Sequence, residues 1–205
     1  MAISRVARSS VAAWNRYNTF LAGNPAFVDA AFESIATTVL SGSQAAVTFS
    51  DISSSQYASL HIRMMTRANA YNANAQIASR LTFNSDTSTT YWMHGLYGDG
   101  SAATAYGTSQ PYIAIRSSIA DTANSNTNAF AAAIIDIHDC GSTTRNKTVR
   151  YLSGFDKNLS NTSYRVELGS GSWPSTAAIT SITLTGDVDF ASGSTFALYG
   201  IKAGA

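Results

Sequence analysis

Short apolar runs separated by clusters of turn-forming residues are the feature that most restricts the fold of this chain. In one run, Leu60, Ile62 and Met64 alternate with His61 and Arg63. A period of two residues places apolar side chains on one face of a β-strand, whereas a helical face repeats every 3.6 residues. Groups of Gly, Ser and Asn lie between the runs and favour turns. The pattern predicts many short strands.

The predicted strands follow one another without intervening helical patterns, which favours an antiparallel sandwich or barrel. We expect an all-β, jelly-roll-like β-sandwich over residues 32–205. Residues 169–172, with the sequence Gly-Ser-Gly-Ser, are interpreted as a turn. The strands are predicted over residues 32–39, 45–49, 60–67, 76–83, 91–97, 112–117, 129–138, 147–154, 164–168, 179–185 and 195–202.

Residues 1–31 differ from the rest and predict an N-terminal arm with a short helix. Ser9 or Ser10 can cap a helix over residues 11–21, and Gly23-Asn24-Pro25 would end it. A helix this short needs a docking partner for its apolar face. We expect the arm to bind a neighbouring subunit; the alternative is that it packs on its own domain. The candidate assembly residues of the arm are Trp14, Tyr17, Phe20 and Leu21.

The composition excludes several kinds of partner. Charged residues make up 12% of the chain and its net charge is +1, so neither nucleic acid nor an anionic membrane is an expected partner.

The single cysteine, Cys140, cannot form an intrachain disulfide. Residues 1–13 lack the apolar stretch of a secretory signal, so we expect synthesis in the cytoplasm.

One polar cluster is a candidate for chemistry. Asp136 and His138 point to one face of a predicted strand, with Asp139 and Cys140 following. A metal site needs further ligands, and the remaining histidines show no ligand spacing relative to this strand. A solvent-exposed strand end explains the same residues. We therefore predict no catalytic residues, no metal, no cofactor and no enzymatic activity; a glycan hydrolase or esterase is the less favoured alternative.

Aromatic residues near predicted loops form a second candidate group. Their rings can stack on sugars, fill a subunit interface or pack within the sandwich. The candidate glycan or interface aromatics are Trp92, Tyr97, Tyr112 and Trp173.

Four stretches carry a resemblance to a known group of proteins. They are residues 32–38 with 47–52, residues 60–63, residues 134–139 with 146–150, and residues 173–185 with 194–202. These stretches resemble structural proteins of tailed bacteriophages, and the closing Phe-Ala-Leu-Tyr-Gly-Ile-Lys is the most specific part. The resemblance implies membership of a virion and brings no catalytic residues.

Two roles follow from this resemblance as expectations. The first is a head decoration or cement protein, a homotrimer that binds the assembled lattice of the major capsid protein. The second is a tail-fibre or tail-tip component that adsorbs to host surface glycans. In both cases the protein is made in the host cytoplasm, is released on lysis and resides in the virion.

Overall fold

Strands dominate the computed structural model, which describes residues 32–70, 77–88, 90–121, 128–156 and 164–202. Within these ranges the only helical element is a short 3-10 helix over Ser54–Gln56. The strands are β1 (Phe32–Val39), β2 (Gln44–Phe49), β3 (Ser59–Thr66), β4 (Ser79–Phe83), β5 (Tyr91–Gly98), β6 (Ala103–Gln110), β7 (Ile113–Ile115), β8 (Ala131–His138), β9 (Lys147–Phe155), β10 (Arg165–Trp173), β11 (Ile182–Phe190) and β12 (Thr195–Ile201).

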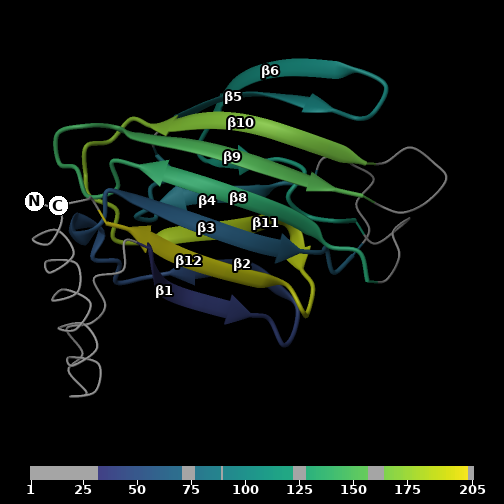
Figure 1. Cartoon of the computed structure of the whole chain (residues 1–205), viewed down its shortest axis with the longest axis horizontal. Helices are drawn as coiled ribbons and strands as arrows, with labels where there is room; N and C mark the ends of the chain where they lie inside the picture. The colour runs from purple at the N-terminus through teal and green to yellow at the C-terminus, as the bar shows by residue number, and fades with distance from the viewer. Residues whose placement is uncertain (1–31, 71–76, 89, 122–127, 157–163, 203–205) are drawn as a thin grey trace, which may run out of the picture. The chain divides into compact units, whose positions relative to one another are not determined.

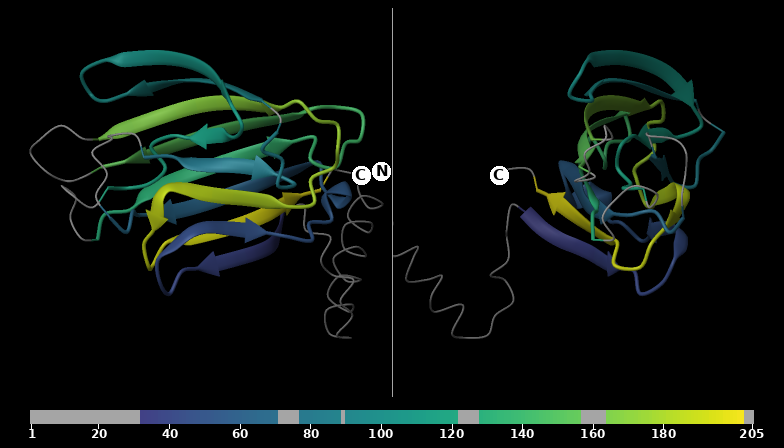
Figure 2. Two further views of the ribbon diagram at one scale, coloured as in Figure 1. Left: turned by 180° about the vertical axis from the view of Figure 1, so that it is seen from behind. Right: turned by 90° about the vertical axis from the view of Figure 1, so that its right-hand side faces the viewer.

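The strands form two antiparallel sheets. The eight-stranded sheet has the order β1-β12-β3-β8-β9-β10-β5-β6, which Figure 1 shows from β6 at the top to β1 at the bottom. The four-stranded sheet has the order β2-β11-β4-β7 and faces the viewer in the left view of Figure 2. This two-sheet arrangement confirms the predicted all-β sandwich.

Eight of the strands pair in a nested way. β1 pairs with β12, β2 with β11, β3 with β8, and β4 with β7, so the first strand pairs with the last and the middle strands with each other. The remaining four strands are two hairpins inserted into this scheme, β5-β6 after β4 and β9-β10 after β8. Both hairpins extend the larger sheet on one side, which doubles its width.

The core lies between the sheets and follows the two-residue alternation. On β3, Leu60 and Ile62 are fully buried, and their partners on β8, Ile137 and Ile135, are buried as well. Phe83 of β4 contributes from the other sheet. Burying an apolar side chain of this size contributes about 1.5–3 kcal/mol. The apolar face of each strand is therefore fixed toward the core, and the intervening residues face solvent.

Two sequence-based predictions about strands are wrong. Residues 169–172 are not a turn but part of β10. The ring of Tyr151 packs against Gly169 and the side chain of Ile113 packs against Gly171, and these contacts stabilise the segment as a strand. β6 was not predicted at all. Its sequence has no apolar alternation, and it owes its conformation to pairing with β5.

The predicted boundary between arm and sandwich falls after residue 31. The chain divides into two units, Met1–Ala31 and Phe32–Ala205. The predicted N-terminal helix and its candidate residues Trp14, Tyr17, Phe20 and Leu21 lie outside the described residues.

Candidate interaction surface

An apolar row crosses the solvent-facing side of the eight-stranded sheet. Ile134 of β8, Leu152 of β9, Leu168 of β10 and Leu96 of β5 lie directly opposite one another in register. Their side chains are 40%, 49%, 52% and 52% exposed, and Val166, two residues from Leu168, is 56% exposed. Directly opposed side chains on one face lie about 5 Å apart. We call Leu152, Leu168, Leu96 and Val166 the apolar ridge.

A shallow depression adjoins this ridge on the same face. It has a volume of about 420 Å³ and lies over β12, β3 and β8. Small side chains create the space, since Ala132 and Ala197 line it together with Arg63, Met65 and Ile134. We call this depression the apolar hollow. Ridge and hollow together leave apolar side chains uncovered across most of the sheet, and contiguous patches of this kind mark interaction sites.

A polar row runs beside the apolar row. His61 Nδ1 lies 2.6 Å from Asp136 Oδ1, and Arg63 Nε donates to His61 Nε2 over 3.3 Å. Because arginine only donates, Nε2 is the acceptor and Nδ1 carries the proton that is donated to Asp136. Both nitrogens of the imidazole are thus occupied by protein partners. This arrangement orients Asp136 and Arg63 on the surface.

The cluster singled out in the sequence is divided by the fold. Asp136 and His138 share the solvent-facing side of β8, as predicted, and Arg150 approaches His138 Nε2 at 3.4 Å. Asp139 instead pairs with Arg145 at 2.9 Å. Cys140 is buried, and burial raises the pKa of its thiol. Among the described residues, no three His, Cys, Asp or Glu side chains converge on a point that could hold a metal ion.

Trp92 is the one predicted aromatic residue with a widely accessible ring. It is 64% exposed on the solvent-facing side of β5, and the residues directly opposite are Ser172 and Ser109. Serine side chains are too short to cover an indole ring. The result is an open aromatic face bordered by two hydroxyl groups.

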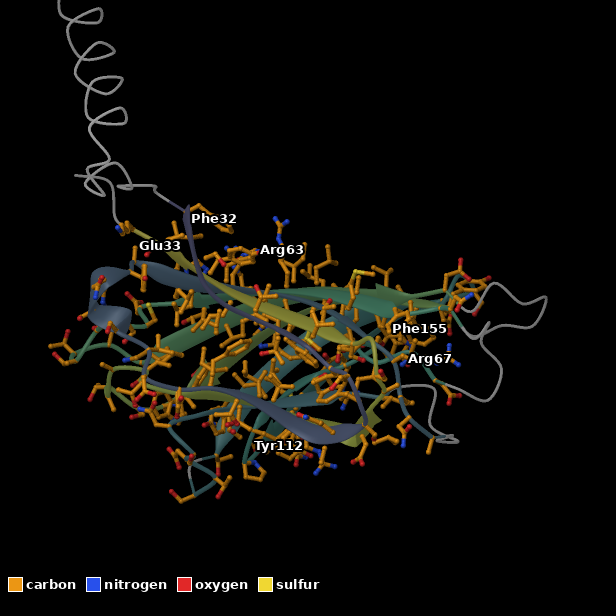
Figure 3. The ribbon with its side chains drawn as sticks, turned by 90° about the horizontal axis from the view of Figure 1, so that it is seen from below. Phe32, Glu33, Arg63, Arg67, Tyr112 and Phe155 are labelled. Atoms are coloured by element: carbon orange, nitrogen blue, oxygen red, sulfur yellow. The ribbon has the colours of Figure 1, made fainter. Side chains whose placement is uncertain are left out.

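The other predicted aromatics are engaged within the domain. The Arg165 guanidinium lies 3.9 Å from the ring centroid of Tyr97, and Arg80 lies 5.0 Å from that of Tyr112. Figure 3 shows Tyr112 on the side of the sandwich opposite Phe32 and Arg63. The prediction that Trp173 offers an accessible ring is wrong. It is 2% exposed, because β10 continues to it and places it in the core.

A buried polar network lies on the core side of the extended sheet and was not foreseen from the sequence. Ser117 Oγ donates to Glu167 Oε2 at 2.9 Å, and Tyr151 donates to Glu167 Oε1 at 3.1 Å. Tyr106 contacts both Tyr151 and Glu167 through its hydroxyl. Burial is the main cause that raises the pKa of Tyr106 and of Tyr151 above the ordinary value. The network joins β6, β9 and β10 to the loop after β7.

Comparison with protein-family models, with curated proteins and with solved structures found no match. The resemblance to phage structural proteins therefore stays a prediction. In the described ranges, no helix is long and apolar enough to cross a membrane.

Proposed function

We propose that the sandwich is a jelly roll with one sheet widened by two inserted hairpins. The nested pairing of β1 with β12, β2 with β11, β3 with β8 and β4 with β7 supports this. Jelly rolls are common in viral capsid proteins and in lectins. Because a fold hosts many functions, the functional argument rests on the surface of the sheet.

We propose that the protein is a non-enzymatic structural component of a phage virion, a head decoration or cement protein that binds the assembled capsid lattice. The observation that carries this is the exposed apolar ridge and hollow, a surface suited to contact with a protein, such as a further copy of the chain in an assembly, rather than to a small substrate. Only 12% of the residues are charged, so neighbouring copies of the chain would repel one another less than copies of a highly charged protein.

The mechanism would be mass action. A protein that binds the assembled lattice and not its separated subunits stabilises the particle in proportion to its occupancy. Partners would be further copies of the chain and the major capsid protein; in our proposal a homotrimer assembles on the particle, at three-fold positions of the capsid lattice. The arm at residues 1–31, with Trp14 and Tyr17, would grip the shell or the adjacent subunit.

Quantifying the protein in purified virions tests this proposal. Head decoration predicts hundreds of copies per particle, whereas a dozen copies would indicate a tail component. Absence of the protein from virions would overturn both roles. In a second measurement, full-length protein with Trp14→Ser and Tyr17→Ser should bind purified particles more weakly than the unchanged chain. Unchanged affinity would overturn the role of the arm.

Trp92 favours a second candidate, a tail-fibre or tail-tip component that adsorbs to host glycans. An accessible indole bordered by Ser172 and Ser109 can stack on a sugar ring and hydrogen-bond to its hydroxyl groups. A glycan array tests it: binding should fall on Trp92→Ala and persist on Tyr112→Ala, whose ring lies against Arg80. An unchanged chain that binds no glycan would contradict this role.

A further inference from the structure

We infer that the solvent-facing side of the eight-stranded sheet is a self-complementary contact, on which a second copy of the chain seats face to face. The two-fold axis would run along the strands, between β8 and β9. The role of this contact in assembly rests on the proposed structural function. The contact itself can be measured on the purified protein, without phage particles.

The position of the axis follows from the strand order. Four strands, β1, β12, β3 and β8, lie on one side of it, and four, β9, β10, β5 and β6, lie on the other. A two-fold axis along the strands places each strand of one copy over its counterpart on the other side in the second copy. β8 faces β9, β3 faces β10, and β12 faces β5. An isologous contact of this kind uses the same surface twice.

Shape complementarity results from this register. The apolar hollow lies over β12, β3 and β8, and the apolar ridge lies on β9, β10 and β5. Within one cross-strand row, Ala197 of one copy faces Leu96 of the other, and Ile134 faces Leu152. Each copy therefore presents a ridge where its partner has a hollow, on both sides of the axis.

Charge complementarity results from the same operation. Asp136 on β8 and Arg150 on β9 are directly opposed within one chain, one on each side of the axis. In the two-fold contact, Asp136 of each copy faces Arg150 of the other. Arg63 lies in the apolar row, where it faces Leu168 of the other copy, and its Nε donates to His61 in the polar row.

The available area is sufficient for a stable dimer. Eight strands about 4.8 Å apart, with four rows about 7 Å apart, give a face of about 1,000 Å². Two such faces amount to about 2,000 Å², and stable interfaces bury about 1,200–2,000 Å² in total. Sheets that pack face to face in this aligned way are separated by about 10 Å, which leaves room for one interdigitated layer of side chains.

Edge pairing is the competing mode of self-association. β6 is an edge strand, and Ala103–Gln110 contains no charged residue to block the addition of another strand. Pairing through β6 would leave the ridge exposed. It would also be insensitive to substitutions at Leu152 and Leu168, so the same experiment separates the two modes.

Sedimentation velocity of the full-length chain tests the contact. The unchanged protein should be a dimer at micromolar concentration. Leu152→Asp and Leu168→Arg should each weaken the dimer by about 30-fold or more, as expected for central interface positions; arginine is chosen at position 168 because this position faces Arg63 of the other copy. Ala45→Asp, at an exposed position of β2 in the other sheet, is the control and should leave the dimer intact.

Charge reversal tests the register. Asp136→Arg alone and Arg150→Asp alone should each be monomeric, since both place like charges across the axis. Their mixture should form a heterodimer, because two arginines then face two aspartates. Circular dichroism verifies that each variant is folded.

Four outcomes would overturn the inference: a monomeric unchanged chain, a trimer in solution, a dimer insensitive to Leu152→Asp and Leu168→Arg, or folded charge-reversed variants that stay monomeric when mixed. Copy number in virions is measured independently, so failure of the dimer and failure of the proposed function are distinguishable.

Discussion

The hydroxyl group of Tyr106 on β6 meets that of Tyr151 on β9 although two strands lie between them. One row of directly opposed residues explains this, since Gly95 of β5 and Gly169 of β10 separate the two tyrosines. With no side chain at either glycine, both rings can lie flat over the sheet and reach each other. The inserted hairpins are thereby joined to each other beneath the surface that carries the apolar ridge.

Gly169→Ala should destabilise the domain by about 1–3 kcal/mol, because the new methyl group would overlap the ring of Tyr151 in a packed core. Gly107→Ala is the matched control. A Cβ there would lie 3.8 Å from the Cβ of His94, an ordinary contact, so its effect should be small. Urea unfolding measures both. Equal free energies of unfolding for the two variants would contradict the packing argument.

Alkaline pH should destabilise the protein through its buried tyrosines. Burial is the main cause that raises the pKa of Tyr91 to about 12 and those of Tyr106 and Tyr151 further above the ordinary value of 10.0. Above pH 10 the unfolded chain loses these protons while the folded chain retains them, so stability is full below pH 10 and falls as the pH rises.

Urea unfolding between pH 8 and 11.5 measures this dependence, and the midpoint should fall above pH 10. Replacing Tyr106 and Tyr151 together by Phe should flatten the decline, because the two tyrosines with the most strongly raised pKa values are removed. A midpoint that does not change with pH would show that the folded and unfolded chains release the same number of protons.

Two tryptophans should differ sharply in their contribution to stability. Trp173 is 2% exposed and donates from Nε1 to Asp86 at 2.9 Å, so Trp173→Ala should cost about 3–5 kcal/mol. Trp92 is 64% exposed, so Trp92→Ala should change the free energy of unfolding by less than about 0.5 kcal/mol. Thermal and urea unfolding of both variants check this. A large cost at Trp92 would indicate that its ring is covered.

Lys147 should be essential to the loop that follows β8. Its side chain is fully buried, and Nζ donates to the carbonyl groups of Ser142, Arg145 and Thr176 at 2.6, 2.8 and 3.2 Å. Lys147→Met should cost about 2–4 kcal/mol, because three carbonyl groups lose the buried charged donor that joins them. Thr148→Met, at the exposed neighbouring position, is the control. Similar urea midpoints for the two variants would contradict this role of the lysine.

Most strands were predictable because their apolar residues alternate. Leu60, Ile62 and Met64 identify β3 from sequence alone, since each must be buried on the same face. β6 was missed and β10 was cut short for a common physical reason. Their residues gain stability from neighbours on other strands, such as the ring of Tyr151 over Gly169, and sequence periodicity does not record such contacts.

The candidate surface was predictable only in part. Trp92 was identified as an accessible aromatic, but Leu152 and Leu168 were expected simply as strand residues. Their importance depends on cross-strand register, which brings residues 96, 134, 152 and 168 into one row. The contact of His61 with Asp136 joins residues 75 positions apart and has no signature in spacing along the chain.

The sequence by itself determined most of the strands, the buried side of each of these and the low surface charge, because these depend on local alternation and composition. The tertiary structure alone decided which solvent-facing residues become neighbours. Sheet order and register depend on the combined packing of all strands around one core, and a shift of one residue would turn every side chain of a strand to the opposite face. The apolar ridge, the apolar hollow and the polar row beside them therefore depend on the sheet order and register.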